Sequence, residues 1–142
     1  MEKELLLKPY LSVGSIKFGM KRNEVEALFG REPEFEHKDF LDRTNLGWGE
    51  ISVIINKKNQ VEEITFSPTG DFQVIWNDID ILNDSDVIKK LNKFEKSSKT
   101  EGVKLYFTIG IALTGVGNAK EKSKSLSVFS KDLEKKWRKY IK

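Results

Sequence analysis

His37 is the only histidine of the chain, and acidic residues surround it in the segment EPEFEHKDFLDR. Glu34, Glu36 and Asp39 could raise the pKa of its imidazole, and a histidine beside carboxylates is a pairing used in general acid–base catalysis. No serine or cysteine is tied to it by a nucleophile motif, and one histidine makes a poor transition-metal site. We therefore expect an exposed loop histidine and no enzyme activity.

A second acidic segment, WNDIDILNDSD, contains Asp78, Asp80, Asp84 and Asp86. It lacks the central glycine and the distal glutamate of a calcium-binding EF-hand loop. Ile79 and Ile81 alternate as in a strand, which would place Asp78 and Asp80 together on its outward face. Asp84 is a good N-cap for a following helix. We expect no metal here.

Two further segments carry weaker signals. The segment TGVGNAKEKS has a G-x-G and a nearby lysine, but not the spacing of a phosphate-binding loop, so we expect a surface loop and no cofactor.

The C-terminal segment SKDLEKKWRKYIK is cationic and amphipathic, with Leu133, Trp137, Tyr140 and Ile141 on one helical stripe. Such a helix packs its stripe on the domain, lies on a membrane surface or binds nucleic-acid phosphates. The residues for the last case are Lys135, Lys136, Arg138 and Lys139.

Charge is sorted along the chain, although the total is only +3. Residues 24–86 hold 15 acidic and five basic residues, whereas residues 87–142 hold 15 basic and five acidic ones. The acid-rich stretch is either ordinary solvated surface or a face that steers a basic partner. Aromatic residues beside acids are typical of protein-recognition patches, although an indole can equally fill the core. We predict partner contacts at Trp48, Asp39, Asp42, Asp78 and Asp80.

Composition indicates one globular domain over residues 1–142. The chain has no cysteine, which excludes disulfides and thiolate chemistry. It has no apolar run long enough to span a membrane, and its first residues make a poor signal peptide, so we expect a cytoplasmic protein that does not bind membranes.

Hydrophobic periodicity predicts the elements that must position these residues. The predicted strands lie near residues 16–18, 46–56, 61–67, 72–76 and 126–129, after an extended start at 5–13. Residues 103–114 are predicted to form a hairpin or a bent strand. The predicted helices cover residues 22–29, 85–94 and 132–141. Lys21, before the first helix, cannot accept a capping hydrogen bond, whereas Ser130 can cap the last one.

The first strand–helix unit returns after 63 residues. Ile16 aligns with Ile79 and Val25 with Ile88 at this offset, and Phe66-Ser67 aligns with Phe129-Ser130. We therefore predict an α+β fold of two tandem strand–helix–three-strand repeats. Repeat 1 covers about 14–76, repeat 2 about 77–130, and the C-terminal amphipathic helix about 131–142. The repeats would form a mainly antiparallel sheet with the helices packed on one face.

The pattern Ile16-x-Phe18-Gly19-Met20-x-x-x-Glu24-Val25-x-x-Leu28-x-Gly30 resembles a bacterial signature of the β-lactamase-inhibitor-protein-like group. That group includes small outer-membrane assembly lipoproteins and tandem-repeat inhibitor proteins. Lys21 replaces the usual threonine, and the absence of a lipid-attachment cysteine argues against the lipoprotein branch. The tandem arrangement is also similar to small immunity proteins encoded beside contact-dependent or polymorphic toxins.

The resemblance implies a non-catalytic, protein-binding module in which a sheet face docks the partner. It implies an immunity protein that occludes the active site of a bacterial toxin domain, and a basic nuclease would suit the acidic stretch. The alternative is a nucleic-acid-binding protein that uses the basic C-terminal half.

Overall fold

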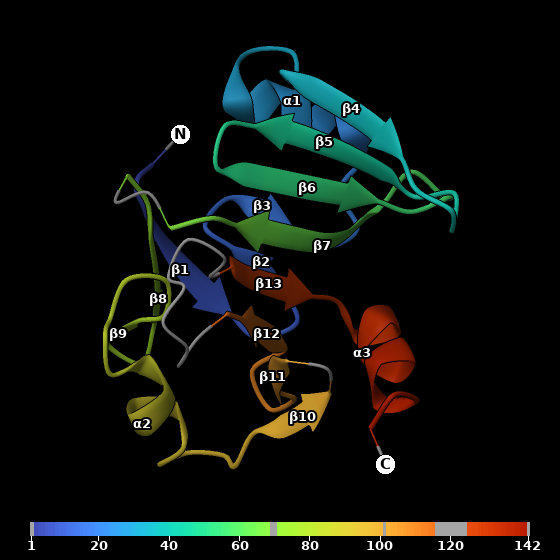
Figure 1. Ribbon diagram of the computed structural model, residues 1–142. Coiled ribbons are helices and arrows are strands. Elements are labelled where there is room, and N and C mark those ends of the chain that lie inside the picture. Colours follow the sequence, from blue (N-terminus) through green and yellow to red (C-terminus); the bar gives the residue numbers. More distant parts are fainter. Residues whose placement is uncertain (1, 69–70, 101, 116–124, 142) are drawn as a thin grey trace.

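The computed structural model describes residues 2–68, 71–100, 102–115 and 125–141, which form an α+β fold (Figure 1). Most of the ordered elements are strands, arranged in two sheets of eight and five strands. The three helices of the described residues are short: α1 (Arg22–Phe29), α2 (Val87–Leu91) and α3 (Lys131–Arg138). None of the described helices is long and apolar enough to span a membrane.

The larger sheet is antiparallel throughout, in the order β10-β11-β12-β13-β7-β6-β5-β4. Its first four strands in sequence are β4 (Phe35–Lys38), β5 (Thr44–Trp48), β6 (Ile51–Ile55) and β7 (Val61–Phe66). The other four are β10 (Ser98–Thr100), β11 (Val103–Tyr106), β12 (Ile111–Thr114) and β13 (Ser125–Phe129). The two sets of four meet where β7 pairs with β13, with Ile64 opposite Val128.

The smaller sheet has the order β3-β2-β1-β8-β9. Its strands are β1 (Glu4–Lys8), β2 (Ser12–Val13), β3 (Ile16–Lys17), β8 (Gln73–Trp76) and β9 (Ile79–Asp80). β1 and β8 pair in parallel, with Leu5 opposite Val74, and the other pairs are antiparallel. This sheet, α1 and α2 contribute side chains to a core that covers one face of the large sheet.

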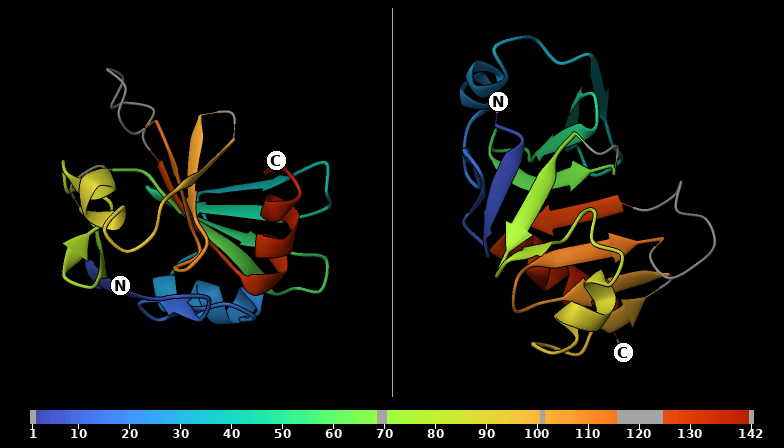
Figure 2. Two further views of the ribbon diagram at one scale, coloured as in Figure 1. Left: turned by 90° about the horizontal axis from the view of Figure 1, so that it is seen from below. Right: turned by 90° about the vertical axis from the view of Figure 1, so that its left-hand side faces the viewer.

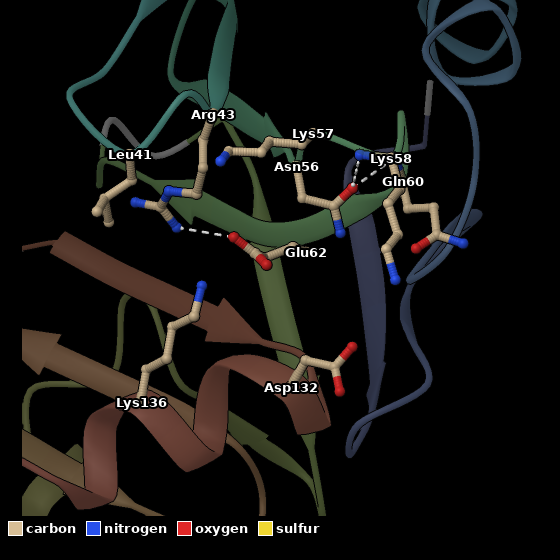
Figure 3. Close-up of a pocket in the computed structure, with 9 residues that line it drawn as sticks. All are labelled: Leu41, Arg43, Asn56, Lys57, Lys58, Gln60, Glu62, Asp132 and Lys136. Atoms are coloured by element: carbon tan, nitrogen blue, oxygen red, sulfur yellow. Dashed lines mark hydrogen bonds and ion pairs between the residues drawn. The ribbon is translucent and has the colours of Figure 1, made fainter.

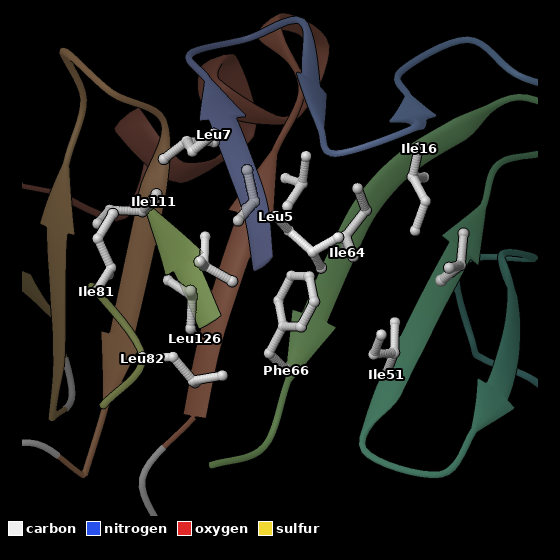
Figure 4. Close-up of a cluster of buried hydrophobic side chains, with 14 of the residues drawn as sticks. Leu5, Leu7, Ile16, Ile51, Ile64, Phe66, Ile81, Leu82, Ile111 and Leu126 are labelled. Carbon is white, nitrogen blue, oxygen red and sulfur yellow. The ribbon is translucent and has the colours of Figure 1, made fainter. Parts of the chain in front are cut away.

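The main core lies between the two sheets (Figure 4). Leu5 and Ile16 from the small sheet pack over Ile64, Phe66 and neighbouring apolar side chains of the large sheet. Figure 2 shows β1–β3 and α1, in blue, along one side of the large sheet in the left-hand view. Because the inward-facing residues alternate with outward-facing ones along each strand, the other face of the large sheet is left with a different set of side chains.

Residues outside α1 supply part of its N-terminal cap. Lys21, at the N-cap, makes no side-chain capping bond, as expected. Its own backbone N–H donates to Glu24 Oε1 at 3.0 Å, and the N–H of Arg22 donates to Asn59 Oδ1 at 3.2 Å. Asn59 lies in the β6–β7 turn, so the cap that the local sequence lacks comes from a distant segment. Gly30 ends the helix with φ 70°.

Helix α3 packs on the opposite face of the large sheet. Leu133 is buried against Phe129, with Trp137 and Ile141 at the border of the same cluster. Ser130 caps the helix, because its Oγ accepts a hydrogen bond from Leu133 N at 3.3 Å. The prediction that this stripe packs on the domain is confirmed for these residues. Tyr140 remains exposed. Hence the helices do not all share one face.

Tyr10 fixes α3 from the β1–β2 turn. Its hydroxyl donates to the backbone carbonyl of Phe107 and lies 3.1 Å from Glu134 Oε2 on α3. Its ring lies against Gly110, where a Cβ atom would approach the ring to 2.9 Å. Lys131 Nζ lies 4.1 Å from the centre of the same ring. One side chain therefore joins the N-terminal turn, the β11–β12 connection and α3.

Several predicted elements need correction. The single strand predicted at 46–56 is wrong, since Gly49 (φ 64°) and Glu50 turn the chain between β5 and β6. The short strands β4 and β10 were not predicted, because their residues are mostly polar and exposed. The second helix is shorter than 85–94. The predicted loop GVGNAKEKSKS falls largely on residues 116–124, outside the described residues.

Candidate functional site

A line of small side chains crosses the face of the large sheet that faces away from the main core. Gly47, Ser52, Thr65 and Ser127 are direct cross-strand neighbours on β5, β6, β7 and β13. Thr65 Oγ1 and Ser127 Oγ lie 3.3 Å apart. We call the surface formed by this line the open face; on the same side of the sheet, α3 covers the neighbouring Phe129 of β13. Gly47 is buried under Phe35, and Ser52, Thr65 and Ser127 are half-buried, so the line forms a low and polar surface.

Phe35 borders the open face on strand β4. It is the cross-strand neighbour of Gly47, and its ring lies over that glycine. A Cβ atom at position 47 would lie only 2.5 Å from Phe35 Cδ1. Glycine is therefore required for this placement of the ring. The side chain remains half exposed and presents an aromatic surface at this border.

The opposite end of the open face carries a partly buried ion cluster. Arg43 lies in the turn of residues 39–43, between β4 and β5, and its Nε donates to Asp39 Oδ2 at 3.0 Å. Its Nη1 lies 3.1 Å from Glu62 Oε2 and 3.2 Å from Glu63 Oε1, both on β7. The guanidinium thus contacts one carboxylate within the turn and two on the sheet, and it joins the turn to the sheet.

The environments of these carboxylates differ. Burial raises the pKa of Glu63 above its ordinary value, and the attraction of Arg43 only partly offsets this effect. At Asp39 burial acts in the same upward direction, but hydrogen bonds from Arg43 and from Leu41 N outweigh it, so its pKa is lowered. Asp39 is therefore held as an anion, whereas Glu63 is easier to protonate.

A cleft separates the 39–43 turn from α3, and we call it the turn–helix cleft. Its apolar part is a cavity of about 140 Å³, lined by Leu41, Leu133, Trp137 and Tyr140, with Arg43, Glu63 and Lys136 beside them. An adjoining polar cavity of about 440 Å³ reaches the β6–β7 turn, where Lys57 and Lys58 line it (Figure 3). Figure 3 shows Lys136 extended from α3 toward Arg43 and Glu62.

Exposed apolar side chains concentrate around these two features. Seven large apolar residues are exposed in the described part of the chain, and four of them belong to β4, the 39–43 turn or the end of α3. They are Phe35, Phe40, Leu41 and Tyr140, and Phe40 is 95% exposed. Exposed aromatic side chains on a monomer commonly mark an interaction surface.

The structure does not bring the five predicted contact residues together. Trp48 is 2% exposed; its indole stacks on Phe29 with ring centres 4.1 Å apart and donates to the Arg31 carbonyl. It therefore belongs to the core, the alternative that the sequence left open. Asp39 and Asp42 lie in the 39–43 turn, where Asp42 is exposed.

Asp78 and Asp80 lie on the β8–β9 hairpin of the small sheet. Asn77 and Asp78 form its two-residue turn with φ 50° and 63°, so the prediction that Asp78 lies in a strand beside Asp80 is wrong. Asp80 accepts hydrogen bonds from the N–H groups of Leu82 and Asn83. Its role here is local, and the contact roles of both acids remain predictions.

Part of the acidic stretch is paired with five basic residues. Eight of the 15 acidic residues of 24–86 form ion pairs, such as Arg22 with Glu36 at 2.8 Å and Arg31 with Glu34 at 2.6 Å. These pairs lower the pKa of Glu36 and of Glu34. The stretch therefore presents less uncompensated negative charge than its composition implies.

His37 lies on the edge strand β4, opposite Asn45, and is exposed. Within the described residues, no group of three or more His, Asp or Glu side chains is arranged to hold a metal ion. Sequence reasoning missed Arg43, Phe35 and Phe40. The available signal for Arg43 was a basic residue next to the acids of the segment FEHKDFLDRT, which also contains Lys38.

A comparison of the chain with protein-family models, with curated proteins and with solved structures finds no match.

Proposed function

We propose that this protein is a non-catalytic protein-binding module that neutralises a bacterial toxin domain, as an immunity protein does. The partner docks on the open face and on the adjoining rim formed by the 39–43 turn and α3. Binding there occludes the active site of the toxin domain. The sequence resemblance to inhibitor and immunity proteins supports the biological class, and the surface geometry supports the mode of binding.

The observation that carries the proposal is the contrast across the large sheet. One face is covered by a second sheet and two helices. On the opposite face α3 covers only the surroundings of Phe129, and the open face keeps a line of small side chains bordered by exposed Phe35 and by the 39–43 turn. Small residues at the centre let a protruding segment of a partner approach the strands closely. Aromatic residues at the border provide large contact areas at low entropic cost.

We further infer that the fold arose from a tandem duplication of a strand–helix–three-strand unit. An offset of 63 residues relates β3 to β9, and it places β4 over β10 and α1 over α2. The hairpin strands depart from it, because β11 and β12 begin 59 and 60 residues after β5 and β6. Closely related sequences that align better with themselves at this offset would support the duplication.

A co-expression experiment tests the function. The toxin domain to use is the variable C-terminal domain encoded by the reading frame immediately upstream. We expect the protein to restore growth and to co-purify with that domain. An upstream metabolic operon, or a toxin domain that is neither bound nor neutralised, would contradict the proposal.

Two substitutions locate the interface. Ser52→Lys places a long charged side chain on the open face, and we expect it to reduce binding at least ten-fold by obstructing close approach. Leu6→Lys is the control, because Leu6 is exposed and lies on β1 of the small sheet, away from the open face. Equal losses in the two variants, each confirmed as folded by circular dichroism, would remove the open face from the interface.

A further inference from the structure

The turn–helix cleft combines an apolar slot with a rim of lysines. Leu41, Trp137 and Tyr140 form the walls of the slot, and Lys136 stands at the boundary between the slot and the polar cavity. Lys57 and Lys58 approach the polar cavity from the β6–β7 turn (Figure 3). Three elements that are distant in sequence therefore meet around one concave surface.

At the base of the cleft, the single positive charge of Arg43 is shared by three carboxylates. Arg43 contacts Asp39, Glu62 and Glu63, as described above. By contrast, Lys57, Lys58 and Lys136 are exposed, and none of the three forms an ion pair with any described residue. The rim thus offers three lysine charges without an ion pair. Of the carboxylates that line the two cavities, Glu62 and Glu63 contact Arg43, and Asp132 forms no ion pair with a described residue.

The size of the slot limits what can enter it. Its volume is about 140 Å³, whereas pockets for small-molecule ligands usually measure roughly 300–1,000 Å³. Such a volume suits one apolar side chain. Phe40 is exposed next to Leu41, so apolar contact can extend beyond the slot.

We propose that the turn–helix cleft binds an acidic segment of the partner protein that carries an apolar side chain at its tip. The apolar side chain occupies the slot between Leu41, Trp137 and Tyr140. Carboxylates on either side of it pair with Lys57, Lys58 and Lys136. This inference rests on the proposed function only in taking the partner to be a protein.

The lining of the cleft favours a protein segment over nucleic acid. Glu62, Glu63 and Asp132 line its two cavities, and carboxylates in these positions repel a row of phosphates. A carboxylate on a flexible peptide can instead lie beside a rim lysine and away from Glu62, Glu63 and Asp132. The apolar slot also favours an apolar side chain, which a phosphate backbone does not provide.

The test uses short synthetic peptides that share a central Leu-Phe pair and differ in its flanking residues, which are aspartates, serines or lysines. Binding to the full chain is followed through the indole N–H signal of Trp137 in NMR spectra, assigned with Trp137→Phe. We expect the aspartate peptide to shift this signal and to bind at least ten-fold more tightly than the lysine peptide. The serine peptide should lie between them.

Charge-matched variants localise the effect. One variant removes the rim lysines by Lys57→Ser, Lys58→Ser and Lys136→Ser. The control removes three exposed lysines on and after α2 by Lys89→Ser, Lys93→Ser and Lys96→Ser. We expect about ten-fold weaker binding of the aspartate peptide in the rim variant, since three exposed charge pairs are lost. The control variant should bind with little change.

Three results would overturn the inference: no shift of Trp137 with the aspartate peptide, equal binding of the lysine peptide, or equal weakening in both lysine variants. Stronger binding of a short DNA duplex than of the aspartate peptide at this surface would replace it with nucleic-acid recognition. The peptide experiment needs no toxin domain. If the aspartate peptide binds as expected but the protein does not neutralise a toxin, only the proposed function is contradicted.

Discussion

Arg43 Nη1 lies 3.1 Å from Glu62 Oε2, and the two side chains are 17% and 6% exposed. This ion pair joins the 39–43 turn to strand β7, next to the position where Glu63 faces the cleft. A buried carboxylate that loses its only cation retains an unfavourable charge, so the arrangement of the turn depends on this guanidinium.

Replacement of Arg43 by methionine should therefore destabilise the protein. We expect the free energy of unfolding to fall by about 3 kcal/mol, because Asp39, Glu62 and Glu63 lose their shared cation. The control is Arg31→Met, which removes an exposed pair with Glu34 and should cost much less. Urea unfolding measures both, and similar losses would show that the cluster contributes no more than a surface pair.

Glu63 makes stability depend on pH in a specific direction. Its pKa is raised in the folded protein, so the folded state binds more protons than the unfolded state between pH 4.5, its ordinary value, and the raised value. Its contribution to stability is therefore fully present below pH 4.5 and declines as pH rises through this window. The variant Glu63→Gln lacks this decline.

We thus expect the stability difference between Glu63→Gln and the wild type to shift in favour of the variant as pH rises from 4.5 to neutral. Glu34 and Glu36, whose pKa values are lowered, lose their stabilisation on acidification in both proteins and largely cancel in the difference. Urea midpoints across this range provide the measurement. A difference independent of pH would contradict the shifted titration.

Tyr10→Phe should loosen α3. The change removes the hydroxyl that bonds the Phe107 carbonyl and contacts Glu134, and we expect a loss of about 1 kcal/mol. Hydrogen exchange of the α3 amides should accelerate more than that of β6. Tyr140→Phe is the control, since Tyr140 is exposed at the end of the same helix. Equal effects of the two variants would show that the Tyr10 hydroxyl does not hold α3 in place.

Gly47→Ala should displace Phe35 from the open face. The new methyl group would lie 2.5 Å from Phe35 Cδ1, and the half-exposed ring can move outward at a cost of about 1 kcal/mol. In a Phe35→Ala background the same substitution should cost much less, which a double-mutant cycle measures. Additive effects would show that the two residues are not coupled.

Hydrophobic periodicity predicted the helices and strands that bury apolar side chains, and it missed the elements whose residues are exposed. Buried residues such as Val25, Ile64 and Val128 indicated the helix at 22–29 and the strands β7 and β13. Their spacing matches the buried face of each element. Strand β4 has four exposed residues, so no such pattern exists in it. Its pairing depends on β5, a relationship between segments that local sequence does not express.

The candidate surface was harder to predict for the same reason. The line Gly47–Ser52–Thr65–Ser127 exists only through the registers of three strand pairs. The turn–helix cleft needs Leu41 and Trp137, which are 96 positions apart, to meet. Trp48, flanked by two glycines, resembled an exposed anchor in sequence, yet Phe29 and the Arg31 carbonyl account for its burial.

The junction of β7 with β13 has a consequence for synthesis on the ribosome. The strands β4–β7 can pair with one another as soon as residue 66 has emerged, but the partner of β7 ends at Phe129. Until β13 has emerged, one edge of β7 stays unpaired. A chain that stops between these points would therefore expose this edge to pairing with a strand of another molecule.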